Sequence, residues 1–130
     1  MQVQKKIFYL EDHEFFANTI IEPLEMDYGE IYYAKNYKEA ESIIKKHGPF
    51  THSIIDVYLQ NGKTGILFVE KNKEFLGKFV FVTGSKDVGT IKTLHSRGYY
   101  SISKIYQSAA DVCNFIENNT KPMIDISEVC

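Results

Sequence analysis

The chain has 130 residues, of which 44% are apolar, and nine Phe and nine Tyr residues supply bulk for the core of one globular domain. Fifteen basic and seventeen acidic residues leave a net charge of −2, which gives no support to nonspecific nucleic-acid binding. No apolar run approaches the ~20 residues that span a bilayer, and no signal-peptide segment opens the chain. Because Cys113 and Cys130 make a poor disulfide framework, we expect a reduced, cytoplasmic protein. From the charge balance and the apolar runs, we expect it to bind neither nucleic acid nor membrane.

Short apolar runs alternate with segments of helical periodicity along the chain. This alternation is typical of a βαβ architecture with a parallel sheet. The apolar runs predict strands near residues 5–10, 30–34, 52–56, 78–83 and 99–103. Because these runs are continuously apolar, we expect helices to cover both faces of the sheet.

A helix is predicted after each strand. In the first helix Phe16, Ile20 and Leu24 share one face, and Pro23 should kink the helix or end it early. The second helix should stop at Gly48-Pro49, and the third is expected to be short. The apolar positions of the last four helices are Tyr37, Ala40 and Ile44; Ile66 and Val69; Val88, Ile91 and Leu94; and Ala109, Val112, Cys113 and Ile116.

The five predicted strand–helix units leave room for one domain. We expect this domain over residues 1–118, a C-terminal tail over residues 119–130, and no effector domain. The tail alternates enough to form a short strand, and a frayed terminus fits it equally well. A protein of this kind would act through its one domain or through a partner.

Polar residues stand at the downstream ends of four predicted strands. Glu11 and Asp12 follow the first strand, Asp56 the third, Thr83 the fourth and Lys104 the fifth. In an open parallel α/β sheet, ligands bind outside the carboxyl ends of the strands, so these residues should converge on one crevice. Three ionised carboxylates repel one another unless a cation neutralises them, and Mg²⁺, which takes oxygen ligands and keeps waters, is the expected cation.

The same residues could support phosphoryl transfer. A carboxylate can act as a nucleophile and form an aspartyl phosphate. A metal and a Lys can neutralise the oxygens of the transferred group, and a Thr hydroxyl could hydrogen-bond it. The five residues occur in this order at separations of 44, 27 and 21 from Asp12 onward.

This arrangement, together with the stretch from Asp56 to Gly62, resembles the receiver domain of two-component response regulators, the CheY-like family. The resemblance covers the chain from about Lys5 to Ile116. It implies a flavodoxin-like (βα)5 three-layer sandwich whose five-stranded parallel sheet has the order 2-1-3-4-5.

The resemblance also implies the metal site and the phosphoacceptor. Asp56 would accept the phosphoryl group and would also bind Mg²⁺. Asp12 would be a direct Mg²⁺ ligand, and Glu11 would support the ion through water. The backbone carbonyl of Tyr58 would complete the protein ligands, and the Tyr58 side chain could shield the acyl phosphate from attacking water.

On the same resemblance Thr83 would be the switch hydroxyl and Lys104 the phosphate-binding cation. Two positions depart from the family pattern. Ile105 follows Lys104 where the family usually has Pro, and Ser101 stands where the family has its switch aromatic. These departures affect signal propagation more than the acid pocket.

The expected function is that of a single-domain phosphoprotein in a two-component or phosphorelay system. A histidine kinase or histidine phosphotransfer protein would donate the phosphoryl group, and output would be binding to a downstream protein, a relay partner or a second copy of the chain. The domain would not be an enzyme beyond its own phosphorylation and slow autodephosphorylation. The main alternative is a pseudo-receiver, an interaction module that does not depend on phosphorylation. A flavodoxin-like binder and a phosphatase-like hydrolase using Asp56 are the remaining alternatives.

Simpler structural roles are also available to single residues. Glu11 and Asp12 could cap the first helix, and His13 should face solvent at its start. Cys113 is expected to be a buried thiol. Tyr99 and Tyr100 are expected to contribute to a partner surface.

Overall fold

Five parallel strands form one sheet in the order β2-β1-β3-β4-β5, as predicted. The computed structural model describes residues 4–59, 64–84, 88–103 and 108–118. Its elements are β1 (Ile7–Leu10), α1 (Glu14–Tyr28), β2 (Ile31–Ala34), α2 (Tyr37–His47), β3 (His52–Asp56), α3 (Gly65–Leu76), β4 (Lys78–Thr83), α4 (Val88–Ser96), β5 (Ser101–Ser103) and α5 (Ser108–Asn118). The expected tail over residues 119–130 lies outside the described residues.

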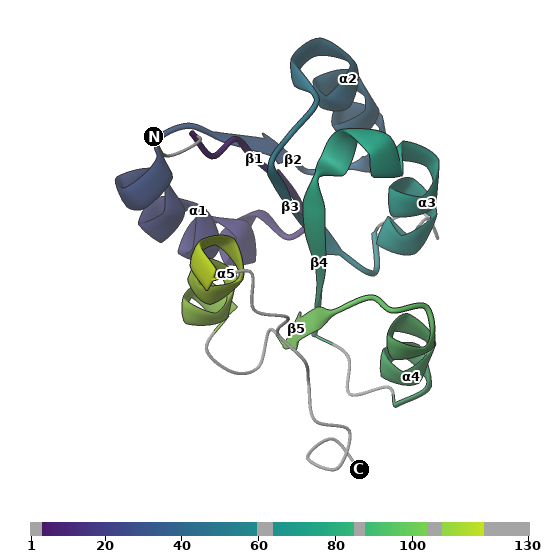
Figure 1. The fold of residues 1–130 in the computed structure, drawn as a ribbon. Coiled ribbons are helices and arrows are strands. Elements are labelled where there is room, and N and C mark those ends of the chain that lie inside the picture. The colour runs from purple at the N-terminus through teal and green to yellow at the C-terminus, as the bar shows by residue number, and fades with distance from the viewer. Residues whose placement is uncertain (1–3, 60–63, 85–87, 104–107, 119–130) are drawn as a thin grey trace.

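Helices cover both faces of the sheet, which confirms the three-layer sandwich. Helices α1 and α5 lie on one face, and α2, α3 and α4 lie on the other (Figure 1). Successive residues of β1 alternate between the faces. Ile7 and Tyr9 pack in the core beneath α1 and α5, while Phe8 and Leu10 pack with α2 and α3. The buried strands therefore read as continuous apolar runs because each strand has a core on both sides.

Helix α1 continues past Pro23 to Tyr28, so of the two predicted outcomes, a kink or an early end, the early end does not occur. A proline in a helix interior removes one backbone hydrogen bond and costs about 3 kcal/mol or more. The flanking residues Ile20 and Leu24 are fully buried against the sheet. Tertiary packing of this kind supplies most of the stability of a protein helix, and here it outweighs the local penalty.

Helix α3 has 12 residues and is longer than predicted. Its backbone leaves the helical region at Asn72, whose side-chain amide donates a hydrogen bond to the carbonyl of Phe68 (2.9 Å). The turn beyond this irregularity ends at Leu76, which is fully buried. Burial of Leu76 explains why the helix extends through a charged segment.

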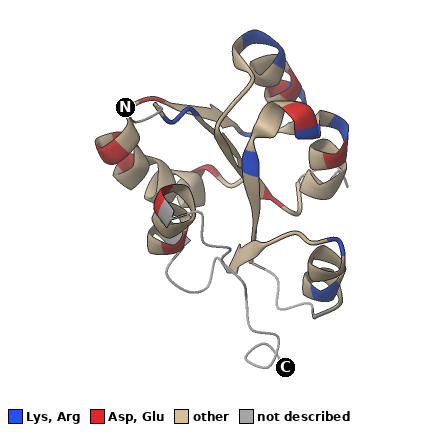
Figure 2. Ribbon diagram, in the orientation of Figure 1, with Lys and Arg blue, Asp and Glu red and all other residues tan. Residues whose placement is uncertain are grey.

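Charge differs between the two helical layers (Figure 2). Helices α1 and α5 contain Asp and Glu but neither Lys nor Arg, whereas α2 and α3 carry both signs. The Lys and Glu residues of α3 are interspersed along the helix and are exposed to solvent.

Candidate functional site

Three carboxylates meet at the carboxyl edge of the sheet. Glu11, Asp12 and Asp56 each place a carboxylate oxygen within 4.8 Å of the others. Glu11 is 0% exposed and Asp56 is 3% exposed, whereas Asp12 is partly exposed. Two carboxylates of this cluster, which we call the acid pocket, are therefore buried, and the third, that of Asp12, is partly accessible to solvent.

Strand pairing brings Glu11 and Asp56 together. Strands β1 and β3 are direct neighbours, with Leu10 opposite Ile55, so the next residue of each strand lies at the same level. The turn after β1 is held by β2. The backbone N–H of Glu11 donates to the carbonyl of Ala34 (3.1 Å), and the Tyr33 hydroxyl donates to the carbonyl of Glu11 (2.7 Å). These two bonds fix the peptide that carries the acid pair.

The cap of α1 is His13, so the alternative that Glu11 and Asp12 cap this helix was wrong. His13 Nδ1 accepts a hydrogen bond from the backbone N–H of Phe16 (3.2 Å). Glu11 Oε2 accepts one from the backbone N–H of His13 (3.1 Å). His13 is exposed, as predicted. A backbone N–H group at the start of α1 is thus capped by His13, one residue beyond the acid pair, and the pair is grouped with Asp56 instead.

The segment after Asp56 is fixed by backbone bonds on both sides. The N–H of Val57 donates to the carbonyl of Val82 (3.2 Å), and the N–H of Gly65 donates to the carbonyl of Val57 (2.8 Å). Thr64 caps α3 by accepting a hydrogen bond from Leu67 N–H (3.2 Å). The β3–α3 connection therefore returns to the end of β3 and holds Asp56 at the pocket.

Gly65 permits this return. A Cβ at position 65 would lie 1.9 Å from the carbonyl oxygen of Asp56 and 2.6 Å from Cγ2 of Ile55. Only glycine allows such close backbone approach. No role was predicted for Gly65 from the sequence, where the available signal was a glycine at the first turn of a helix.

Thr83 ends β4 and is 1% exposed. Its strand neighbours β3, with Val82 opposite Asp56, so Thr83 stands at the same edge as the acids. The structure therefore brings Glu11, Asp12 and Asp56 together and places Thr83 on the adjoining strand. Lys104 and Ile105 lie outside the described residues, so the role assigned to Lys104 stays a prediction.

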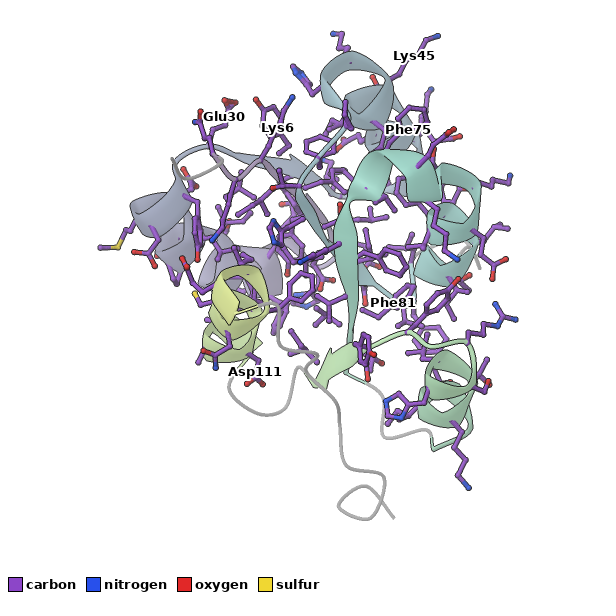
Figure 3. All side chains as sticks on the ribbon, in the orientation of Figure 1. Lys6, Glu30, Lys45, Phe75, Phe81 and Asp111 are labelled. Carbon is purple, nitrogen blue, oxygen red and sulfur yellow. The ribbon has the colours of Figure 1, made fainter. Side chains whose placement is uncertain are left out.

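The aromatic residues before Lys104 differ from expectation. Tyr99 is buried and packs on Phe79 and Phe81, with ring centroids 5.3 and 5.5 Å away, so its assignment to a partner surface was wrong. Phe81 of β4 packs on the face of the sheet that α2, α3 and α4 cover (Figure 3). Tyr100 is partly buried on the opposite face, beside α5. Ser101 is fully buried, and its Oγ has no hydrogen-bond partner within the part of the chain that the structure describes.

Cys113 also differs from its prediction. It lies on the apolar face of α5 as expected, but its side chain is partly exposed. Burial is the main cause that raises the pKa of its thiol, followed by the charges of Asp27 and Glu117. A thiol with a raised pKa is a poor nucleophile, so Cys113 is a packing residue.

Tyr9 borders the acid pocket from within the core, and the sequence analysis missed it. Its side chain is fully buried, and its hydroxyl has no hydrogen-bond partner in the described ranges. Burial, followed by the charges of Glu11 and Asp56, raises the pKa of Tyr9. A neutral phenol next to these carboxylates adds no positive charge to the cluster.

The donor set fits a hard divalent cation. All three clustered groups are carboxylates, and oxygen ligands of this kind suit Mg²⁺ and Ca²⁺. Two of the three are buried, and burying a charge is costly unless it is paired. The residues present therefore match a site for a divalent cation on chemical grounds.

Comparison with known proteins identifies the fold. No family model and no curated protein match the sequence. Among solved structures, a CheY-like response regulator receiver domain protein from Methanospirillum hungatei JF-1 has a TM-score of 0.74 at 19% identity, covering 98% of this chain and 97% of that one. A response regulator protein from Burkholderia pseudomallei, with a phosphorylated aspartic acid, a calcium ion and citrate, has a TM-score of 0.74 at 20% identity, covering 96% and 70%.

Not all of the similar structures are response regulators. An adenylate cyclase from Rhodopirellula baltica has a TM-score of 0.74 at 21% identity, covering 98% of this chain and 90% of that one. Most of the similar structures are nevertheless response regulator receiver domains. The chain thus has the flavodoxin-like fold of CheY-like receivers, as the sequence predicted. Within the described ranges, none of the helices combines the length and apolar character needed to cross a bilayer.

Proposed function

We propose that this receiver-fold chain is a phosphoacceptor of a two-component or phosphorelay system, with Asp56 as the acceptor. The observation that carries the proposal is the acid cluster, whose carboxylate oxygens lie within 4.8 Å of one another at the carboxyl edge of the sheet. Ligands of open α/β sheets bind at this edge. In a receiver fold, Asp56 is the carboxylate that ends β3 beside Thr83.

The metal site follows from the same residues. Asp12 and Asp56 would hold Mg²⁺ directly with the backbone carbonyl of Tyr58, and Glu11 would support it through water. When bound, the ion supplies charge neutralisation for the carboxylates and the phosphoryl oxygens. The resemblance assigns the remaining phosphoryl charge to Lys104 and the hydrogen bond of the switch to Thr83.

The reaction is a phosphoryl transfer from a phosphorylated histidine of a kinase or phosphotransfer protein. An Asp56 carboxylate oxygen forms the new bond to phosphorus, and the bond from phosphorus to the imidazole nitrogen breaks, leaving its electron pair on that nitrogen. Water later hydrolyses the acyl phosphate and restores the carboxylate. The chain acts on no further substrate.

Output is a binding event in the cytoplasm. A phosphoryl group on Asp56 would draw Thr83 toward it and shift the surface of α4, β5 and α5, which is a population shift biased by new charge-assisted contacts. The partner would be a downstream protein, a relay protein or a second copy of the chain. The buried Ser101, in place of an aromatic, favours the second candidate function, a pseudo-receiver that binds partners without phosphorylation.

The intact mass of the protein tests the proposal. We expect acetyl phosphate with Mg²⁺ to add one phosphoryl group to the wild type and none to Asp56→Asn. Asp111→Asn on α5 is the matched control and should be labelled like the wild type. Chelation of Mg²⁺ should prevent labelling. If the folded wild type binds Mg²⁺ yet gains no mass, the pseudo-receiver is the correct function.

A further inference from the structure

The side chain of Tyr58 links the acid pocket to α4. Tyr58 follows Asp56 by two residues and is 48% exposed. Its hydroxyl shares a hydrogen bond of 2.5 Å with the Thr90 hydroxyl. Thr90 lies in the first turn of α4, 32 residues further along the chain. The bond therefore joins two segments that strand order alone does not connect.

The backbone around Tyr58 is held on the side of the sheet. Val57 is bonded through its N–H to Val82 and through its carbonyl to Gly65, and Tyr58 itself pairs with Thr64 in an isolated antiparallel bridge. Because these backbone bonds restrict local changes of conformation, the segment should move as one unit. Any shift of the Tyr58 peptide is therefore passed to its side chain and, through the hydroxyl, to Thr90.

Helix α4 is connected to the remainder of the domain near both of its ends. Its apolar side chains Ile91 and Leu94 are fully buried, and Leu94 belongs to the core cluster that contains Phe81 of β4. Beyond its last turn Arg97 forms an ion pair with Glu70 of α3. At its first turn the Tyr58 bond provides the connection to the β3–α3 segment. Loss of that bond would leave the first turn of α4 with weaker ties to the acid pocket.

We propose that Tyr58 is a positioning residue whose hydrogen bond with Thr90 holds the metal-binding carbonyl in place and couples metal binding to the position of α4. The inference rests on the proposed function, which assigns that carbonyl to the metal. Coupling of this kind is reciprocal, so an arrangement of α4 that favours the bond strengthens metal binding, and metal binding stabilises that arrangement. The tether also supplies a route to α4 in a chain whose buried Ser101 offers no aromatic ring.

Removal of either hydroxyl tests the tether. The variants are Tyr58→Phe, Thr90→Val and the double variant, each titrated with Mg²⁺ by calorimetry. A net hydrogen bond contributes about 0.5–1.5 kcal/mol, so each single variant should bind Mg²⁺ about 2- to 10-fold more weakly. Because both substitutions remove the same bond, the double variant should lose no more than a single one.

Thr93→Val is the matched control. Thr93 lies one turn further along α4, and its hydroxyl donates to the carbonyl of Gly89 within the same helix (2.8 Å). Its Mg²⁺ affinity should equal that of the wild type. Hydrogen exchange of the α4 amides provides a second measurement: Mg²⁺ should slow exchange over residues 91–96 in the wild type and in Thr93→Val, and should have a smaller effect in the Tyr58 and Thr90 variants.

The outcomes separate this inference from the proposed function. Absence of Mg²⁺ binding to the wild type would overturn the proposed function, and the positioning role with it. Wild-type binding with equal affinities in all variants, or losses that add in the double variant, would overturn the positioning role alone. An equal loss in Thr93→Val would show that α4 substitutions act through general destabilisation, which also overturns it.

Discussion

The two ends of the sheet differ in how their charged side chains are arranged. At the carboxyl end, Glu11, Asp12 and Asp56 bring like charges within 4.8 Å. At the amino end, Lys5 Nζ lies 3.2 Å from Glu117 Oε2, and the Tyr28 hydroxyl donates to Oε1 of the same carboxylate (2.5 Å). Opposite charges pair at one end, while like charges accumulate at the other.

Lys6, the second lysine at the amino end, also has interaction partners. Lys6 Nζ lies over the rings of Tyr32 and Phe50, 5.4 Å from each centroid, and donates to the carbonyl of His47 (Figure 3). A cavity of about 380 Å³ opens here, lined in part by Lys5, Lys6 and Glu30, yet both ammonium groups already have partners. The comparison teaches that the cavity at the amino end is lined by charges that already have partners, whereas the carboxyl end gathers three groups of the same charge.

Gly65→Ala should have the largest effect, and it falls at the carboxyl end. The added Cβ would meet the Asp56 carbonyl at 1.9 Å, so the helix start must move. We expect a loss of about 3 kcal/mol in the free energy of unfolding, measured by urea denaturation, together with weaker Mg²⁺ binding. Gly29→Ala is the control: its φ of 80° is strained for Ala but no atom lies within 4 Å, so about 1 kcal/mol is expected. Equal losses would refute the close packing.

Asp56→Asn should stabilise the protein when no divalent cation is present, because it removes one of the three like charges. Coulomb repulsion between the carboxylates at this distance predicts a gain of about 2 kcal/mol in the free energy of unfolding. Thermal unfolding in a chelator measures it, with Asp111→Asn as the control. Added Mg²⁺ should raise the melting temperature of the wild type and have little effect on Asp56→Asn. A less stable Asp56→Asn protein would contradict like-charge repulsion in the pocket.

His52 gives the amino end a pH dependence. Burial, followed by the charges of Lys5 and Lys78, lowers the pKa of His52 from 6.5 to about 4. Between these values the unfolded chain binds the proton and the folded protein does not, so stability is present above about pH 6.5 and falls as the pH drops toward 4. Denaturation as a function of pH should show this loss in the wild type and a flatter profile in His52→Gln. The exposed His47→Gln variant should keep the wild-type profile.

Glu117→Gln should have the smallest effect. The pKa of Glu117 is lowered mainly by hydrogen bonds from Tyr28 and Lys5, but its carboxylate is exposed and screened by solvent. We expect a slight decrease in melting temperature at low salt that disappears at high salt. A decrease that persists at high salt would show that this group is more than a surface ion pair.

Fold prediction succeeded where burial controls the local pattern. The runs ending at Leu10, Asp56 and Thr83 became strands because a strand covered on both faces must be apolar throughout. Helix ends were less predictable. Pro23 marks a break by local rules, yet burial of Leu24 carries α1 past it. Local propensity and packing conflict at such positions, and packing decides.

Site prediction followed the same division. The placement of Glu11, Asp12 and Asp56 together, with Thr83 on the adjoining strand, was predictable because residues after parallel strands meet at one edge, while their functional roles stay predictions. The metal chemistry and the role of Lys104 stay predictions.

The sequence by itself determined the alternation of strands and helices and the residues at the carboxyl edge, because both depend on periodicity and chain order. Only the tertiary structure decided that His13 caps α1, that Tyr33 holds the Glu11 peptide and that Tyr58 reaches Thr90. The Tyr33 and Tyr58 contacts join residues 22 and 32 positions apart. No local pattern encodes these two contacts, because they form only when the strand order and the packing of helices on the sheet bring distant side chains together.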